Sequence, residues 1–299
     1  MKKQSVGGQA VIEGVMMQSK EKRAIAVRKS NGEIVVRKNK IKSWINEKNI
    51  DKIPFLRGSF VLIETMIEGI KSLNFSSEFF LDEVEEDAFD RFIKKMFKDK
   101  SNDVMIGISM IIAFVLSVGL FVLLPTIVGG AFSKLINNDL LLNLIEGAIR
   151  ICILFGYIVL ISKSKDIERV FQYHGAEHKS IYCYENNLEL TVENAKKFGR
   201  LHPRCGTNFL FIVMFISIIL FSFFGWPNPI LRVVMRIVCI PIVAGISYEI
   251  IRFLGKYNNK FTKIVAYPGM MLQKFTTKEP DDEQLEVAIA ALKAIIDEK

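Results

Sequence analysis

Long apolar stretches are the feature that most constrains the fold of this chain. A helix that crosses the hydrocarbon core of a bilayer needs about 20 predominantly apolar residues, because each residue adds about 1.5 Å. Four stretches meet that requirement, at residues 104–131, 139–162, 206–224 and 229–254. Half of all residues are hydrophobic, which is typical of the membrane class. The sequence therefore predicts a mainly α protein, an integral membrane helical bundle with four spans.

Lysine and arginine are distributed unevenly between the loops, and this predicts the orientation of the spans. Residues 163–205, which join the second and third spans, carry eight of these cations. The connection between the first and second spans carries only Lys134, and the connection between the third and fourth spans carries no lysine or arginine. Cytoplasmic loops are enriched in lysine and arginine, so we expect this loop and both termini on the cytoplasmic side. The predicted location is the cell (inner) membrane, crossed several times.

The formal net charge of +8 does not require a nucleic-acid partner. Anionic lipids of the inner leaflet attract the same cations, and the chain has no nucleic-acid-binding motif. We therefore expect membrane lipid, and no nucleic acid, as a partner.

Five charged residues fall inside the second and fourth spans. They are Glu146, Arg150, Arg232, Arg236 and Glu249. Charges are costly in lipid, so we expect these side chains to face other helices, an interface or a wet cavity.

The N-terminal residues 1–50 have the composition of a small antiparallel β segment. Three stretches read as strands: QAVIEGVMM, KRAIAVRKS and EIVVRKNK. The Asn-Gly pair in SNGE predicts a hairpin turn between the last two.

Residues 54–100 begin with a predicted helix and end in a charged linker. Between residues 54 and 80 the helix is apolar almost all round, except that Arg57, Glu64, Glu68 and Lys71 fall on one narrow stripe. Such a stripe fits a helix at the membrane interface that turns its carboxylates towards the protein. An ordinary amphipathic helix on a soluble core fits equally well.

The C-terminal residues contain a predicted soluble helix that Pro280 and several acids open. Its apolar face comprises Leu285, Ala288, Ile289, Leu292 and Ile296. The chain thus divides into a β segment (1–50), the interfacial helix and linker (54–100), a transmembrane hairpin (104–162), a cytoplasmic loop (163–205), a second transmembrane hairpin (206–254) and a cytoplasmic tail (256–299).

All three histidines of the chain lie in the cytoplasmic loop. If residues 170–184 are helical, His174 and His178 are four positions apart and share one helix face, as two ligands of one ion do. HGAEH also fits the pattern H-x-x-E-H, in which the glutamate acts on a zinc-bound water. The sequence therefore predicts a divalent metal site, with zinc as the cofactor and Glu177 as the general base. The alternative is that these are ordinary hydrogen-bonded histidines at the surface or in the core.

Further ligands must come from elsewhere in the chain. His202 and Cys205 in HPRC are ordinary zinc donors three residues apart, and Glu249 lies at the cytoplasmic end of the fourth span. If a water molecule occupied one position of the metal's coordination sphere, the site would be catalytic. If protein ligands occupied all four positions, the metal would only hold the loop to the third span. Cys205 as a nucleophile beside His202 is a less favoured alternative.

Several motifs together resemble the YqhQ-like family of multi-spanning membrane proteins. They are GGQAVIEGVMM, HGAEHK, HPRCGT, SYEIIRF and PGMMLQKFTTKEPDDEQLEVAIAAL, and the resemblance covers essentially the full length. Members are described as uncharacterised, and are sometimes labelled metal-dependent enzymes. The resemblance marks as motif residues Glu13, His174, Glu177, His178, His202, Arg204, Cys205, Glu249 and Arg252.

These features favour a metal-dependent, hydrolytic enzyme at the cytoplasmic membrane face. Glu64 and Glu68 of the interfacial helix are further candidate site residues. A site at headgroup level would meet a lipid, a lipid-linked substrate or a juxtamembrane peptide. The alternative is a membrane scaffold or assembly factor with a structural metal. A transporter is less favoured, because no repeated half is apparent.

Overall fold

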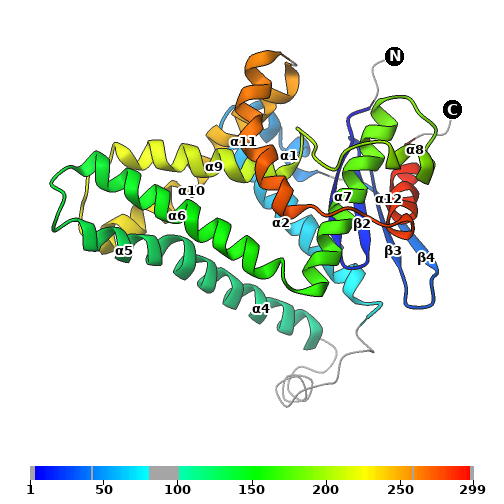
Figure 1. Cartoon of the computed structure of the whole chain (residues 1–299), viewed down its shortest axis with the longest axis horizontal. Helices are drawn as coiled ribbons and strands as arrows, with labels where there is room; N and C mark the ends of the chain where they lie inside the picture. The colour runs from blue at the N-terminus through cyan, green and yellow to red at the C-terminus, as the bar shows by residue number, and fades with distance from the viewer. Residues whose placement is uncertain (1–3, 42, 81–100, 258, 297–299) are drawn as a thin grey trace. The chain divides into compact units, whose positions relative to one another are not determined.

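The computed structural model describes residues 4–41, 43–80, 101–257 and 259–296 (Figure 1). These residues are mainly helical, with one antiparallel sheet near the N-terminus, in agreement with the predicted class. The charged linker predicted after residue 80 lies outside the described residues.

The chain forms two compact units. The first comprises Met1–Phe80, Ile158–Ile216 and Pro241–Lys299, and the second comprises Leu81–Tyr157 and Ser217–Ile240. The predicted metal-site residues all belong to the first unit.

The sheet has four strands rather than the three that the sequence predicts. Its antiparallel order is β1-β2-β3-β4, and the strands are β1 (Gly7–Val11), β2 (Gly14–Gln18), β3 (Lys22–Arg28) and β4 (Ile34–Lys40). The reading of QAVIEGVMM as one strand is wrong, because the chain reverses at Glu13, which has a φ of 48°. Because apolar residues continue on both sides of this turn, the sequence pattern does not predict it. The Asn-Gly turn is confirmed, with Gly32 at a φ of 87°.

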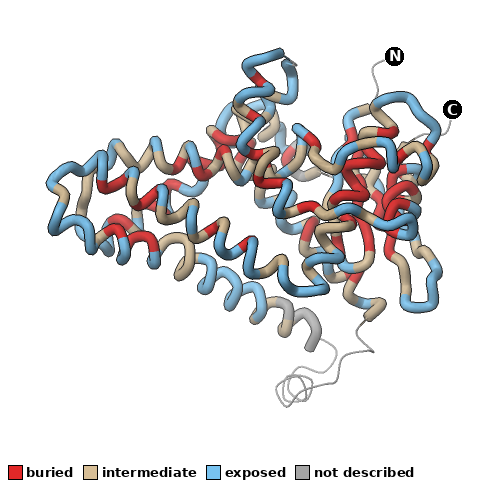
Figure 2. Tube along the Cα trace, in the orientation of Figure 1, coloured by how far each residue is buried: buried red, intermediate tan, exposed pale blue. Residues whose placement is uncertain are grey.

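Alternate residues of the strands belong to two separate apolar clusters. Helices lie beside the sheet (Figure 1), and the chain is largely buried where they meet (Figure 2). The helices α7 (Lys165–Glu185) and α12 (Asp282–Ile295) pack on one face, and α2 (Leu56–Ser77) contributes Phe75 to the other. Strand residues in the first cluster are Val15, Met17, Ala24 and Ala26, and those in the second are Val11, Met16, Ile25 and Val27. The first unit therefore joins segments from both ends and the middle of the chain around one sheet.

The predicted C-terminal helix is confirmed as α12. Asp281 and Gln284 form a capping box at its start, with Asp281 Oδ1 accepting from the Gln284 amide at 2.8 Å. The predicted apolar face is buried in the core except at Ile296, which follows the helix and is half-buried.

The predicted helix after Pro54 is confirmed as α2, and the carboxylates of its polar stripe are turned towards the protein, whereas Lys71 is exposed. Glu64 accepts a hydrogen bond from Ser43 Oγ at 2.9 Å. Glu68 pairs with Arg23 of β3 and with Lys71. The carboxylates are thus satisfied by the chain itself.

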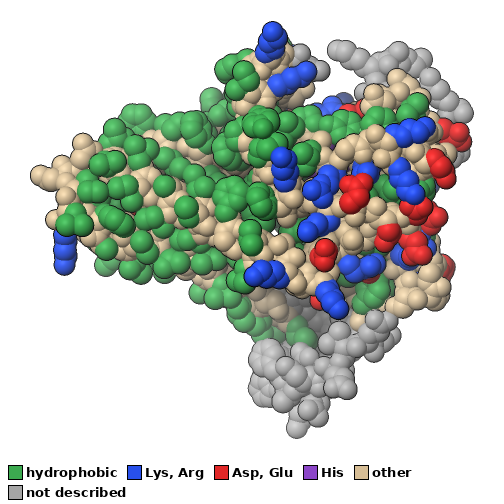
Figure 3. Space-filling model, viewed as in Figure 1, with side chains coloured by type: hydrophobic (Ala, Val, Ile, Leu, Met, Phe, Trp, Pro, Cys, Tyr) green, Lys and Arg blue, Asp and Glu red, His purple; other side chains and the backbone are tan. Residues whose placement is uncertain are grey.

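Three helical stretches among the described residues are long and apolar enough to cross a membrane: Gly107–Phe132, α6 (Asp139–Ile161) and α10 (Pro229–Lys256). The first comprises most of α4 (Ser101–Val118), a π-helical turn (Gly119–Leu123) and α5 (Leu124–Phe132). The third predicted span is α9 (Gly206–Ser222), an apolar but shorter helix. Figure 3 shows hydrophobic side chains over most of the visible face of the second unit.

The charges predicted inside the second span face other helices. Glu146 of α6 is 1% exposed, and its carboxylate pairs with Arg236 of α10. It also lies 3.3 Å from Arg150 Nη2 and 3.5 Å from Arg232 Nη1. Thr126 Oγ1 donates to it at 3.1 Å. One carboxylate therefore balances three guanidinium groups within apolar helices.

The remaining elements are short except for one helix that was not predicted. They are α1 (Trp44–Glu47), a 3-10 turn (Ile50–Lys52), α8 (Val192–Lys196) and α11 (Lys260–Thr276). Asn259 and Thr262 form a capping box that starts α11. Pro268 and Gly269 interrupt its pattern, which explains why the sequence does not predict a helix here.

Candidate metal centre

Helix α7 has two buried faces with different roles. Tyr173, Ala176 and Cys183 enter the hydrophobic core against the sheet. His174 and His178 lie on another face, towards residues 200–205 and the end of α11. The helical arrangement of the two imidazoles is therefore confirmed, and the core fixes the helix that carries them.

Both imidazoles are held by backbone carbonyl groups. His174 Nδ1 donates to Thr276 O at 2.9 Å, and His178 Nδ1 donates to Arg200 O at 2.5 Å. The ring centroids are 4.5 Å apart. Because a carbonyl oxygen only accepts, each Nδ1 carries the proton and each Nε2 has a free lone pair. A second hydrogen bond of this kind is how proteins orient metal-binding histidines.

The sulfur atom of Cys205 lies close to the Nε2 atoms of both histidines. Its Sγ lies 3.1 Å from His174 Nε2, and one ligand atom from each of His174, His178 and Cys205 lies within 4.8 Å of the others. His178 Nε2 is buried without a hydrogen-bond partner among the described residues. The Cys205 thiol is nevertheless close enough to raise the pKa of His178, against the larger effect of burial. A buried polar atom without a well-formed hydrogen bond is costly, so an additional ligand would stabilise it.

The donor set fits a zinc ion. Zinc bonds of about 2.3 Å to sulfur and 2.0–2.1 Å to nitrogen place such ligands about 3.5 Å apart at a tetrahedral centre. The three atoms of this cluster would need to move by only about an ångström to reach that spacing. Two imidazoles and one thiolate leave one position of a tetrahedron open.

Burial keeps the neighbouring imidazoles neutral. It lowers the pKa of His178, and it lowers the pKa of His202 to about 4. Neutral imidazoles are the form that binds metal ions, so no proton has to leave these rings at neutral pH.

His202 lies near the cluster, but both of its nitrogens are engaged elsewhere. Its ring centroid is 5.6 Å from that of His178. Nδ1 accepts from the Arg204 amide at 3.3 Å, and Nε2 faces Glu185 Oε2 at 3.4 Å. The structure thus brings His202 to the site without placing it among the three clustered ligands.

Gln273 of α11 is a site residue that sequence reasoning missed. Its side chain is fully buried and pairs with the backbone of His202, accepting at Oε1 and donating from Nε2, each at 2.8 Å. Nε2 also lies 3.4 Å from Asn208 Oδ1. This clamp holds the loop that presents Cys205. A glutamine in PGMMLQKF gives no sequence clue to this role.

Glu177 is buried beside the cluster, on the side of the sheet. It is 5% exposed and accepts a hydrogen bond from the Gly8 amide of β1. A Cβ added at Gly8 would lie 2.9 Å from Glu177 Cδ, so this glycine permits the close approach. Burial raises the pKa of Glu177, while His174, His202 and the Gly8 amide oppose the shift.

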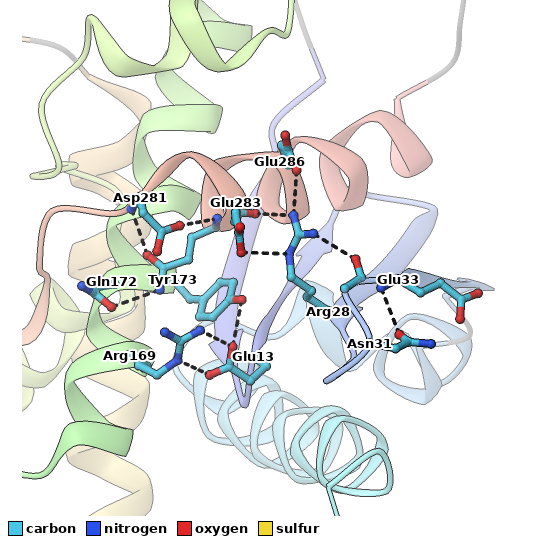
Figure 4. Close-up of polar contacts among 12 residues, drawn as sticks. Glu13, Arg28, Asn31, Glu33, Arg169, Gln172, Tyr173, Asp281, Glu283 and Glu286 are labelled. Carbon is cyan, nitrogen blue, oxygen red and sulfur yellow. Dashed lines mark hydrogen bonds and ion pairs between the residues drawn. The ribbon is translucent and has the colours of Figure 1, made fainter.

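The other candidate residues are not among the three clustered ligands, and most of them form ion pairs. Glu249 accepts from Arg57 Nε at 2.6 Å and from the Phe55 amide at 3.2 Å, and Arg252 is exposed. Arg204 pairs with Glu185. Glu13, at the β1–β2 turn, pairs with Arg169 of α7 and accepts from Tyr173 Oη at 3.2 Å (Figure 4). Glu13 therefore connects the sheet to α7. In the same way, Glu68 connects α2 to Arg23 of the sheet, and Glu64 connects α2 to Ser43.

Gly175 lets the segment after α11 approach the site helix. A Cβ at this position would lie 2.1 Å from Lys278 O, and the Lys278 amide donates to Phe171 O at 2.8 Å. We expect Gly175→Ala to lower the free energy of unfolding by about 1–3 kcal/mol through overpacking. It should also displace His174, because this imidazole is anchored on Thr276 of the same segment.

Thermal unfolding of the purified protein, followed by circular dichroism, tests this expectation. Gly156→Ala is the control, since its Cβ would meet no described atom within 4 Å. That variant should be unchanged or more stable. Equal stability of the two variants would show that the contact at Gly175 is unimportant.

A cavity of about 650 Å³ adjoins the cluster in the first unit. Cys205 and His202 lie in its wall, together with residues of α9, α10 and α11. The thiol is therefore shared between the cluster and a space large enough for a small molecule.

Comparisons with known proteins agree with the resemblance seen in the motifs. The family described as "Protein of unknown function (DUF1385)" matches residues 53–298. "Uncharacterized protein YqhQ" of Bacillus subtilis (strain 168) is 38% identical over 292 residues, which are 97% of this chain and 92% of the relative. No solved structure matches the chain. The site must therefore be interpreted from its own chemistry.

Proposed function

Since this chain belongs to the DUF1385 family, whose description assigns no activity, we propose a function from the geometry of the site. The protein is a membrane enzyme with a zinc site held by His174, His178 and Cys205. The observation that carries this proposal is the clustering of the buried Nε2 of His178, the Nε2 of His174 and the thiol of Cys205, whose atoms lie within 4.8 Å of one another.

The proposed chemistry is hydrolytic. A bound zinc ion lowers the pKa of a coordinated water to about 7. Glu177 immediately precedes His178, and burial raises the pKa of its carboxyl. A carboxylate with a raised pKa is a stronger proton acceptor when ionised. The cavity beside Cys205 supplies the space for a substrate. Glu177 would accept a proton at its carboxylate oxygen, while the carbonyl groups of Thr276 and Arg200 hold the imidazoles.

The proposal includes four membrane spans with both termini in the cytoplasm. Helix α9 has 17 residues and would extend about 25 Å, near the lower limit for a span. Cys205 directly precedes α9, so the zinc site would lie at the cytoplasmic surface. Alkaline phosphatase fused after residue 226 should be active in the periplasm. An inactive fusion there would mean that α9 does not cross.

Replacement of Glu177 tests the catalytic role. We expect Glu177→Gln to retain zinc and thermal stability, because the amide keeps the shape and can accept from Gly8. It should nevertheless fail to complement a deletion, since a general base contributes about 10²–10⁴-fold to a rate. His178→Ala is the comparison and should lose both zinc and complementation.

A structural zinc site in a scaffold is the second candidate. It is favoured by the way the cluster joins α7, the 200–205 loop and the end of α11 through backbone hydrogen bonds. Full complementation by Glu177→Gln, together with loss of complementation in His178→Ala, would select the scaffold over the enzyme.

A further inference from the structure

The cavity beside Cys205 has an apolar wall. Ile212 of α9, Ile251 and Leu254 of α10, and Ala266 and Met270 of α11 line it. Its volume of about 650 Å³ lies within the usual range for small-molecule sites. Because α10 is apolar enough to cross a membrane, this wall is built partly from a helix suited to a lipid environment.

Another part of the lining is charged. Arg204 and Lys263 contribute two cations, and Glu185 contributes one carboxylate. Arg204 pairs with Glu185, but a guanidinium group has five N–H donors and this ion pair leaves most of them available. The cavity therefore combines apolar side chains with an excess of positive charge, next to the thiol of the proposed zinc site.

Three of the uncharged polar side chains that line the helical wall already have partners within the chain. Asn208 donates to Pro203 O and accepts from Gln273. Thr262 Oγ1 donates to Asn259 O, and Tyr182 Oη donates to Leu201 O, each at 3.0 Å. A peptide would bring backbone groups that need partners, whereas a hydrocarbon chain needs none. This difference favours a lipid over a juxtamembrane peptide.

We propose that the cavity binds an anionic lipid, with its phosphate near Arg204 and Lys263 and its first methylene groups against Leu254 and Ile251. This inference names the substrate class and rests on the proposed function for its link to zinc. The binding of the lipid itself depends only on the cavity.

Titration of full-length protein in detergent with dilauroyl phosphatidic acid, followed by native mass spectrometry, tests the proposal. Dilauroylglycerol and inorganic phosphate are the comparison ligands. We expect the phosphatidic acid to bind at least about tenfold more tightly than dilauroylglycerol, a difference of about 1.4 kcal/mol. Millimolar inorganic phosphate should not displace it. Displacement by phosphate would overturn the proposal and indicate a site for free phosphate.

Two substitutions on neighbouring residues of α10 locate the binding. Leu254→Trp fills the cavity and should reduce binding at least about tenfold. Phe253→Trp is the matched control, because Phe253 is 52% exposed and does not line the cavity. Equal binding by the two variants would overturn the proposal.

Lys263→Gln provides a test that does not depend on core packing, because this side chain is exposed. We expect about fivefold weaker binding of phosphatidic acid and unchanged binding of dilauroylglycerol, since a lysine near an anionic headgroup contributes about 1 kcal/mol. An unchanged affinity for phosphatidic acid would contradict the proposed role of this residue.

Measuring both the zinc content and the binding of the lipid on the same protein distinguishes failure of the proposed function from failure of the lipid site. If the lipid binds in the cavity and the protein holds no zinc, the proposed function fails while the lipid site stands. If zinc is present and Leu254→Trp binds the lipid as wild type does, the lipid site fails and the zinc site stands.

Discussion

His178→Ala should abolish stoichiometric zinc binding, with an affinity reduced more than about a hundredfold. Loss of a group that merely orients a ligand already costs 10–100-fold, and this substitution removes a ligand. The buried Nε2 of His178 forms no well-aligned hydrogen bond among the described residues, and the nearest candidate ligand atoms belong to His174 and Cys205. Competition with a chromogenic zinc chelator measures the affinity.

His202→Gln is the matched control for this experiment. His202 is also buried, but its nitrogens already contact the Arg204 amide and Glu185. We expect the variant to keep zinc with an affinity within about tenfold of wild type, the lower end of the range for a group outside the ligand set. Loss of zinc in His202→Gln and retention in His178→Ala would reverse the ligand assignment.

Glu146→Ala should destabilise the second unit by about 3–5 kcal/mol, the usual cost of removing one partner of a buried ion pair. Three arginines would then share an apolar environment without their carboxylate. Arg232 also stacks on Trp226, 3.7 Å from the ring centroid, so it cannot turn away without losing that contact. We expect the thermal midpoint to fall by on the order of 10 °C.

A double variant distinguishes charge balance from packing. Glu146→Gln should be less damaging than Glu146→Ala, because the amide can still accept from Thr126. Adding Arg236→Met to Glu146→Gln should restore part of the stability, since one unpaired guanidinium is removed. If the double variant is as unstable as the sum of the single variants, the charges are not coupled and the argument fails.

Local patterns in the sequence predicted much of the fold, because they report on single helices and strands. The spacing of His174 and His178 predicted a shared helix face, and the stripe of Glu64 and Glu68 predicted carboxylates turned towards the protein. The face of α12 from Leu285 to Leu292 followed from helical periodicity. In each case the relevant residues lie within one or two turns of each other.

Contacts between distant segments could not be predicted in the same way. The packing of α12 on the N-terminal sheet depends on complementary surfaces more than 240 residues apart, and neither surface identifies its partner. The clamp of Gln273 on His202 joins an ordinary glutamine to backbone atoms. Glu249 was a reasonable ligand on topology alone, but Arg57 of α2 accounts for its charge.

The sequence predicted that the three histidines share a site, but it did not predict which of their nitrogens are available to a metal ion. Concentration of all three imidazoles in one loop pointed to a common site, and the structure places the His178 ring next to those of both His174 and His202. Which nitrogens are free depends on hydrogen bonds to Thr276, Arg200 and the Arg204 amide. Backbone partners of this kind have no counterpart in a residue pattern.

Elemental analysis of the full-length protein, purified in detergent without added metal or chelator, tests the central claim most directly. The account predicts about one zinc ion per chain in wild type and less than roughly 0.1 in a folded His178→Ala variant, as expected when one of three protein ligands is removed. Wild-type protein that is folded, contains no zinc and takes up none from a micromolar solution would contradict it.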